Sequence, residues 1–251
     1  MTPRQLLTEW LTRQLSAEVN AWLQQAVQQI ESSGNDAALY LAVSLATRKT
    51  GKAGLMLDED DLQNAQASCP GWHPGNWTLE QAARIRLLLS LEQDTQHLAH
   101  CLDQLCITAD ADELVAFYRG LPLYPDPPRY VARATEGLRS NMQNVFEAVA
   151  HYNPYPAAQL GESAWNQMVL KALFTGSSLR PITGLEQRCN VTLAGMLCDY
   201  ARERQAAQRP IPRELWRCVT PCATGKMLQG LEHIYREDKA MGETGDSYEI
   251  D

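Results

Sequence analysis

The sequence lacks any apolar stretch long enough to cross a membrane. Its longest strongly apolar run, ALYLAVSLA at residues 38–46, is far shorter than the roughly 20 residues that a transmembrane helix needs. The first residues, MTPRQLLTEWLTRQL, also lack the charged, apolar and small-residue segments that together mark a secretory signal. We therefore expect a protein that does not span a membrane.

An excess of basic residues is also missing. The 251-residue chain has 22 Lys and Arg against 30 Asp and Glu, which gives a formal net charge of −8 and a pI of about 5.2. Proteins that bind nucleic acid generally have the opposite bias, because they must attract phosphate groups. We therefore expect no nucleic-acid partner.

The seven cysteines lack the spacing of a disulfide framework, and their number is odd. A small secreted protein would be expected to carry an even set of cysteines at framework spacing. Scattered cysteines are typical of reduced thiols, so the sequence indicates a soluble cytoplasmic protein of bacterial type.

Alternating strand patterns with hairpin turns are absent as well. Apolar residues instead recur at the spacing that places them on one side of a helix. The first two such segments carry Leu6, Leu7, Trp10, Leu11 and Leu15, and then Val19, Trp22, Leu23, Val27 and Ile30. Short connections between amphipathic helices favour antiparallel neighbours. We predict an all-α fold of antiparallel helix pairs, arranged as a bundle or as a short HEAT/armadillo-like stack.

The predicted helices extend through most of the chain and are expected to form one domain at residues 1–222. Proline removes a backbone donor and restricts the residue before it. The segment PLYPDPP at 122–128 is therefore the best candidate for a seam between two lobes. Residues 223–251 are predicted to contain a weak helix near 225–237 and an acidic tail without apolar periodicity, which we expect to be disordered.

A helix predicted at residues 131–151 has an unusual polar side. Opposite its apolar stripe lie Ser140, Asn144, Glu147 and His151, whereas a solvated face normally carries Lys, Glu and Arg. Glu147 and His151 are four residues apart, so a hydrogen bond between their side chains is geometrically available. This side is either an ordinary outer face or one wall of a polar cleft.

The helix predicted at 163–175 has an amide within its apolar arc. In AWNQMVLKALF, at residues 164–174, Asn166 falls between the directions of apolar residues on a 3.6-residue turn. A buried amide is costly unless its hydrogen bonds are met. Asn166 therefore either bonds the backbone of the loop before it, or reaches one cavity together with Lys171.

The segment before this helix, HYNPYP at residues 151–156, contains Asn153 and Tyr155. Its prolines fix the backbone, which predicts a rigid connector between two helices. The aromatic rings of such a connector would wall one side of the space that Asn166 and Glu147 border.

After the helix, Arg180 and Arg188 lie on either side of Gly184. Two arginines at this spacing would hold a carboxylate or a phosphate through bidentate hydrogen bonds. The alternative is that they form ion pairs with Glu186 and Asp199. The adjacent Asn190 is predicted to cap the next helix, whose apolar pattern continues to residue 208.

No complete catalytic or cofactor motif is present, whether a nucleophile elbow, a Rossmann fingerprint or a phosphate loop. His97, His100 and Cys101 lie on one predicted helix, and the spacing of His97 and Cys101 would suit two zinc ligands. The sequence offers no second cluster to complete a tetrahedral site, and Cys218 with Cys222 has the same weakness. We therefore expect no metal and no cofactor.

Residues 118–219 resemble the EboA family. They contain NPYP at 153–156, AWNQMVLKA-F at 164–174, I-GL-R-N at 182–190 and DYA-ER-AA-R at 199–209, in the family's order. The resemblance implies a component of the bacterial ebo operon, which is linked with moving or maturing secondary-metabolite precursors across the cytoplasmic membrane. It also implies operon neighbours that include a prenyltransferase-like membrane protein and sugar-phosphate-type enzymes. The motif positions carried over, without catalytic roles, are Asn153, Tyr155, Asn166, Lys171, Arg188 and Asn190.

Three functional hypotheses follow. The first, favoured by the missing catalytic constellation, is a non-catalytic adaptor that binds operon partners or a metabolite precursor. The second is an enzyme or enzyme subunit that acts on a small anionic metabolite, with a general base and a cation in a polar cleft. The third is a purely structural helical repeat. The candidate cleft residues are Glu147, His151, Asn153, Tyr155, Asn166, Lys171, Arg180 and Arg188.

Overall fold

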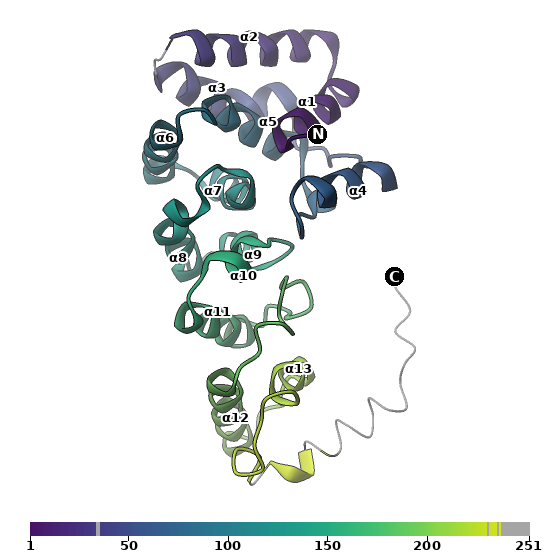
Figure 1. The fold of residues 1–251 in the computed structure, drawn as a ribbon, viewed down its shortest axis with the longest axis vertical. Coiled ribbons are helices and arrows are strands. Elements are labelled where there is room, and N and C mark those ends of the chain that lie inside the picture. Colours follow the sequence, from purple (N-terminus) through teal and green to yellow (C-terminus); the bar gives the residue numbers. More distant parts are fainter. Residues whose placement is uncertain (34–35, 230, 235, 237–251) are drawn as a thin grey trace. The chain divides into compact units, whose positions relative to one another are not determined.

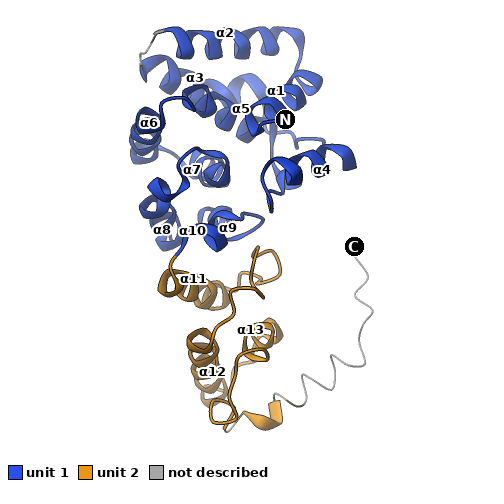
Figure 2. Ribbon diagram, viewed as in Figure 1, with its two compact units in different colours: residues 1–160 blue, residues 161–251 orange. Residues whose placement is uncertain are grey.

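The computed structural model describes residues 1–33, 36–229, 231–234 and 236. Across these residues the secondary structure is α-helix and short 3-10 helix, with one isolated antiparallel bridge between Gly54 and Thr78 and no β-strand. The all-α prediction is confirmed. The chain divides into two compact units, residues 1–160 and residues 161–251 (Figure 2).

The first unit is a succession of helices joined by short connections (Figure 1). Its α-helices are α1 (Pro3–Gln14), α2 (Ala17–Ser33), α3 (Asp36–Thr50), α4 (Glu59–Ser68), α5 (Leu79–Leu88), α6 (Thr95–Thr108), α7 (Ala111–Arg119), α8 (Val131–Arg139), α9 (Gln143–Ala150) and α10 (Tyr155–Gln159). Its 3-10 helices are η1 (Pro74–Asn76), η2 (Leu89–Leu91), η3 (Leu121–Leu123) and η4 (Pro127–Tyr130).

Helices of the first unit pack as a series of neighbours. α3 packs against both α2 and α5, α5 packs against α7, and α7 packs against α9. α5 is buried along its whole length, because it has neighbours on several sides. The rings of Trp10, Trp72 and Trp77 extend the core beside α1, with consecutive centroids 5.4 Å and 5.7 Å apart.

Polar side chains fix where four of these helices begin. Thr2, Asp58, Thr78 and Asp110 precede α1, α4, α5 and α7, and each accepts a hydrogen bond from the third backbone N–H of its helix. The side chain at that third position bonds back to the capping residue. Such capping boxes satisfy donors that have no partner inside the helix, and each cap contributes about 1 kcal/mol.

The second unit contains α11 (Glu162–Thr175), α12 (Val191–Ala206), η5 (Arg213–Leu215) and α13 (Trp216–Val219). Gly176 ends α11 in the left-handed conformation, at a φ of 76°, which glycine adopts without a steric penalty. The Asn190 side chain accepts a 2.8 Å hydrogen bond from the Leu193 N–H at the start of α12. The predicted capping role of Asn190 is therefore confirmed.

Residues 131–151 do not form the single helix that the apolar pattern predicted, because α8 ends at Arg139 and α9 begins at Gln143. Ser140 lies between them, and its Oγ accepts a 3.1 Å hydrogen bond from the Met142 N–H. A serine that bonds the nearby backbone in this way competes with helix continuation. Ser140 therefore does not share a helical face with Glu147 and His151, and the predicted polar side is shorter than expected.

The proline-rich residues 122–128 lie inside the first unit, in and between η3 and η4. Tyr124 is buried there, and its hydroxyl donates to the Phe117 carbonyl at 3.3 Å. Of the weak helix predicted near 225–237, residues 232–234 and 236 are helical, whereas residues 230, 235 and 237 lie outside the described residues. The predicted disordered tail, residues 237–251, also lies outside them.

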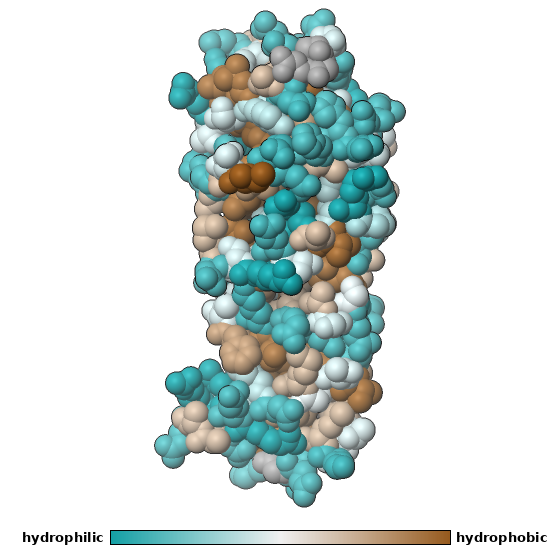
Figure 3. Space-filling view, turned by 90° about the vertical axis from the view of Figure 1, so that its left-hand side faces the viewer, coloured by the Kyte–Doolittle hydropathy of each residue, from teal (hydrophilic) through white to brown (hydrophobic). Residues whose placement is uncertain are grey.

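Hydrophilic residues predominate on the face shown in Figure 3, and hydrophobic ones are scattered between them. Exposed apolar side chains include Leu41, Met56, Ile107 and Phe174. Scattered exposure of this kind is ordinary for a folded chain. Among the helices that the structure describes, none combines the length and the apolar character that a membrane crossing requires.

Candidate functional site

The eight candidate cleft residues are divided between the two units, whose boundary falls directly before α11. The first unit holds Glu147, His151, Asn153 and Tyr155, and the second unit holds Asn166, Lys171, Arg180 and Arg188. The contacts of each set are described below within its own unit. A common cleft formed by all eight residues stays a prediction.

Asn153 is 2% exposed and bonds backbone atoms of three neighbouring elements. Its Nδ2 donates to the carbonyls of Tyr118, at the end of α7, and Ala148, in α9, each at 3.0 Å. Its Oδ1 accepts from the N–H of Tyr155, at the start of α10, also at 3.0 Å. The amide therefore ties α7, α9 and α10 together.

Tyr155 is buried, and its hydroxyl donates to the Pro127 carbonyl at 2.5 Å. Burial raises the pKa of this phenol above its ordinary value. Tyr152, by contrast, is 46% exposed and has a φ of 52°, in the left-handed region that few non-glycine residues adopt. The HYNPYP segment is thus a connector anchored by Asn153 and Tyr155, with Tyr152 as its exposed ring.

Glu147 and His151 lie at the end of α9. Glu147 Oε1 accepts a 2.8 Å hydrogen bond from Gln143 Nε2, one turn earlier. The backbone N–H of His151 donates to the Glu147 carbonyl at 2.8 Å, and His151 is extended, so the helix ends there. Both residues are half-buried, and the Nε2 atom of His151 is buried, so this nitrogen does not face solvent.

Asn166 forms a reciprocal pair of amide hydrogen bonds with Asn190. Asn190 Nδ2 donates to Asn166 Oδ1 at 2.9 Å, and Asn166 Nδ2 lies 3.3 Å from Asn190 Oδ1. Asn190 also donates to the Arg188 carbonyl at 3.2 Å. The partner of the buried amide is therefore a capping side chain that follows α11 in the sequence.

Replacing Asn166 with alanine is expected to lower the free energy of unfolding of the second unit by about 1–3 kcal/mol, because two amide hydrogen bonds with the half-buried Asn190 are lost and each is worth about 0.5–1.5 kcal/mol. Chemical denaturation followed by tryptophan fluorescence measures the change. Gln167→Ala is the matched control, since Gln167 is exposed on the same helix. Equal stability of the two variants would contradict an anchoring role for Asn166.

Arg188 lies over the ring of the buried Trp165, with its Cζ 4.7 Å from the ring centroid. A cation over an indole face gains roughly 0.5–2 kcal/mol, depending on its solvation. Lys171 lies six residues after Trp165 on α11. It is partly buried, and burial lowers its pKa. The second unit thus places two cations against apolar surroundings.

Arg180 forms an ion pair with Glu214 at 3.8 Å. Glu214 in addition accepts hydrogen bonds from the Ser178 hydroxyl and the Leu179 N–H, at 2.7 Å and 2.5 Å. The carboxylates that the sequence suggested as alternative partners are engaged elsewhere, in the ion pairs Glu186–Arg217 and Asp199–Arg202. Glu214 therefore replaces the expected acidic partners beside Arg180.

A buried arginine that sequence reasoning missed lies at the base of a groove in the first unit. Arg86, on α5, is 6% exposed, and its guanidinium donates to Thr8 Oγ1 at 2.7 Å and to Ser90 Oγ at 3.0 Å. The groove has a volume of about 150 Å³. It is lined by side chains of α1, α2 and α5, namely Thr8, Thr12, Asn20, Leu23, Gln24, Val27, Gln28, Glu31 and Arg86.

Among the described residues, no carboxylate forms an ion pair with Arg86. The nearby Glu31 and Glu92 are paired with Arg4 instead. Burial, together with the positive charge of Arg4, lowers the pKa of Arg86 to about 10, so the side chain stays cationic at neutral pH. Its signal in the sequence is a basic residue inside the apolar run RIRLLLSL.

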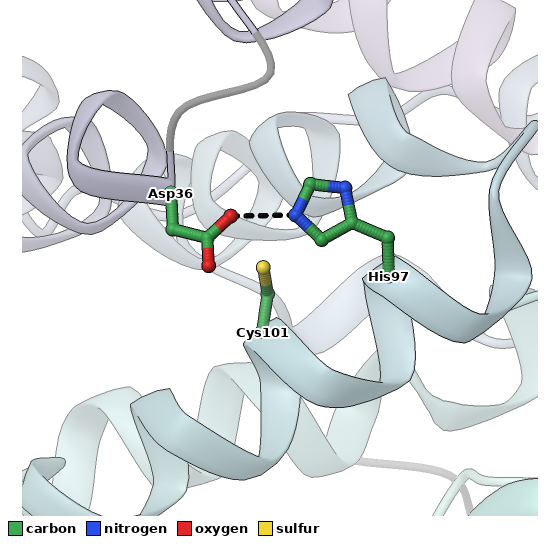
Figure 4. A group of neighbouring side chains, drawn as sticks. All are labelled: Asp36, His97 and Cys101. Carbon is green, nitrogen blue, oxygen red and sulfur yellow. Dashed lines mark hydrogen bonds and ion pairs between the residues drawn. The ribbon is translucent and has the colours of Figure 1, made fainter.

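Two helices of the first unit bring together Asp36, His97 and Cys101 (Figure 4). Asp36 is the first residue of α3, whereas His97 and Cys101 are one turn apart on α6. Asp36 Oδ1 lies 2.5 Å from His97 Nε2, and the ligand atoms of all three residues lie within 4.8 Å of one another. The sequence suggested only His97 and Cys101, because no local pattern links them to a residue 61 positions earlier.

The surroundings of this cluster, which we name the α3–α6 cluster, change the acidity of its members. The hydrogen bond with His97 holds the pKa of Asp36 below its ordinary value. Burial raises the pKa of Cys101 to about 11, even though a hydrogen bond from Tyr40 acts in the opposite direction. The cluster therefore combines a carboxylate, an imidazole and a buried thiol.

Comparison with models of protein families shows a match over most of the chain. The model of a protein family described as metabolite traffic protein EboA matches residues 3–220. No curated protein and no solved structure matches the chain. The family match covers nearly all of the first unit and residues 161–220 of the second, and it begins well before residue 118, where the sequence resemblance begins.

Proposed function

The chain belongs to the EboA family of metabolite traffic proteins, and from this premise we propose that it is a non-catalytic metabolite-handling protein. In this proposal it acts in the cytoplasm as a helical adaptor for other products of the ebo operon, such as a prenyltransferase-like membrane protein. It helps to move or mature secondary-metabolite precursors. The family match over residues 3–220 is the observation that carries the proposal.

The role of the motif residues supports an adaptor rather than an enzyme. Asn153 bonds three backbone groups, Asn166 pairs with Asn190, and Tyr155 bonds the Pro127 carbonyl. These side chains hold helices and their connections in place. A catalytic group must instead reach a reacting atom of the substrate.

The Arg86 groove supports binding of a small anion. A buried guanidinium without a carboxylate partner offers charge and directed donors to a carboxylate or phosphate group. The hydroxyl and amide groups of Thr12, Asn20 and Gln24 line the same groove. We infer that an anionic part of a metabolite lies against Arg86, where it would compensate the buried charge.

Purification from a host that expresses the whole operon, followed by native mass spectrometry, tests this proposal. Wild type is expected to retain a small molecule. Arg86→Met is expected to bind it at least about tenfold more weakly, and so to carry less of it, because one charge-assisted hydrogen bond is worth roughly 1.5–3 kcal/mol. Arg86→Lys keeps the positive charge but lacks the planar guanidinium with its several N–H donors. Its affinity for the small molecule is expected to lie between those of wild type and Arg86→Met. Arg48→Met removes an exposed arginine and is expected to behave as wild type.

A wild-type chain that retains neither a small molecule nor an operon protein would contradict the proposal. A chain that carries operon proteins but no small molecule would make it an adaptor without a ligand. Circular dichroism of each variant shows whether a loss of occupancy reflects misfolding.

The alternative proposal is an enzyme or enzyme subunit that acts on a small anionic metabolite. It rests on the partly exposed Glu147 as a general base and on Lys171, whose pKa is lowered by burial. Under our proposal, Glu147→Gln and Lys171→Met leave the output of the pathway unchanged while both proteins fold. Loss of output in folded variants would favour the enzyme, and in vivo complementation measures it.

A further inference from the structure

We propose that Asp36, His97 and Cys101 of the α3–α6 cluster form a binding site for one zinc-type divalent ion. Three ligands of different chemistry converge there from two helices, with their ligand atoms within 4.8 Å of one another (Figure 4). The site lies within the first unit. It is separate from the Arg86 groove and does not depend on the proposed metabolite binding.

The set of donor atoms selects the class of metal. Thiolate sulfur and imidazole nitrogen are the usual ligands of zinc in proteins, and a carboxylate oxygen is also common. Calcium and magnesium prefer ligand sets made of oxygen atoms, which the buried sulfur of Cys101 does not match. Zinc or cobalt therefore fits this cluster better than a hard cation does.

The ligand atoms lie within 4.8 Å of one another, so small side-chain movements would bring them to the spacing of a tetrahedral site. With metal–ligand distances of about 2.0–2.3 Å, the ligand atoms of a zinc site lie roughly 3.3–3.6 Å apart. The Asp36 Oδ1 to His97 Nε2 distance is 2.5 Å, so it has to lengthen by about 1 Å when a metal replaces the hydrogen bond. Rotation of the Asp36 side chain, which is 33% exposed, would supply this change.

The two helices prepare the ligands differently. His97 and Cys101 are four residues apart in the first two turns of α6, so their side chains leave the helix on the same side. Asp36 begins α3 and approaches from the other helix. A bound ion would therefore cross-link α3 to α6, and its affinity would add to the stability of the first unit.

Access and outer contacts also fit a metal site. The side chains of His97 and Asp36 are 27% and 33% exposed, whereas Cys101 is fully buried beneath them. An ion can therefore enter from solvent and meet the thiolate below. Tyr40, one turn after Asp36, lies next to Cys101 and would orient its sulfur, as outer-shell partners of metal ligands commonly do. Three protein ligands leave a fourth position for water.

Cobalt titration of the chelator-treated full chain tests the site. Wild type is expected to bind one equivalent of Co²⁺ with a thiolate-to-cobalt charge-transfer band, and Zn²⁺ is expected to abolish the band by displacing cobalt. His97→Gln and Cys101→Ser are each expected to weaken binding at least about a hundredfold, since loss of an outer-shell partner alone costs 10–100-fold. Asp36→Asn is expected to weaken binding while keeping the thiolate band.

His100→Gln and Cys106→Ser are the matched controls, because both residues lie on α6 outside the cluster. Both variants are expected to bind cobalt as wild type does. Absence of a thiolate band in wild type, or an equal band in His97→Gln, would overturn the proposal, since cobalt would then be unbound or held by other cysteines. Added zinc is expected to raise the thermal unfolding midpoint of wild type but not of folded Cys101→Ser. An unchanged midpoint in wild type would equally overturn it.

Discussion

Replacing Arg84 with methionine is expected to lower the free energy of unfolding of the first unit by about 3–5 kcal/mol, because the change leaves a buried carboxylate without its cation. Arg84 and Glu80 are one turn apart on α5, and both side chains are 3% exposed. They form a direct ion pair. Burial lowers the pKa of Arg84, but its guanidinium remains charged at neutral pH.

The same pair connects three helices. Arg84 Nη2 donates to Thr47 Oγ1, on α3, at 2.9 Å, and lies 3.4 Å from Glu113 Oε1, on α7. Thr47 Oγ1 donates in turn to Glu80 Oε2 at 3.2 Å. Since α3, α5 and α7 are successive neighbours in the first unit, loss of either charge leaves an uncompensated group between all three.

Urea unfolding measures the free energy of unfolding of wild type, Arg84→Met, Glu80→Gln and the double variant. These four values give the loss caused by each single change and the interaction energy between the two side chains. The double variant is expected to be less destabilised than the sum of the single changes, because no lone charge remains buried. Lys52→Met removes the exposed ion pair with Asp112 and is expected to cost less than about 1 kcal/mol. Additive single costs would contradict a coupled buried pair.

Most of the helices could be predicted from local signals in the sequence. Apolar spacing predicted the all-α fold, and Asn190 was recognised as a cap because its role depends on residues next to it. The break at Ser140 was missed because the apolar pattern continues across it, whereas the hydrogen bond to the Met142 N–H interrupts only the backbone. Helix boundaries depend on such local competition as much as on periodicity.

Contacts between distant residues could not be predicted in the same way. Asn166 was recognised as a buried amide, but its partner Asn190 lies 24 positions later. The contact between His97 and Asp36 joins residues 61 positions apart, and Arg86 has no ion-pair partner among the described residues for reasons of three-dimensional packing. Periodicity shows that a polar residue is buried, whereas the folded arrangement of helices decides what it meets.

Replacing Asn153 with alanine is expected to lower the free energy of unfolding of the first unit by about 3–5 kcal/mol. The change leaves the Tyr118 and Ala148 carbonyls and the Tyr155 N–H without the partner that the amide supplies. Each buried polar group that loses its partner costs about 1–3 kcal/mol. Asn141→Ala, at an exposed asparagine of the same unit, is expected to be nearly neutral, and urea unfolding measures both.

Asn153→Asp makes the anchoring role of the NPYP motif sharply testable. A carboxylate can still accept from the Tyr155 N–H, but it presents an acceptor to the two carbonyls that now receive hydrogen bonds. It is therefore expected to destabilise the first unit at least as much as alanine does. If instead both variants unfold as wild type does and lose a bound metabolite in native mass spectra, Asn153 contacts the ligand. Destabilised variants whose folded fraction still carries the ligand would place the motif in the scaffold, and metabolite recognition elsewhere.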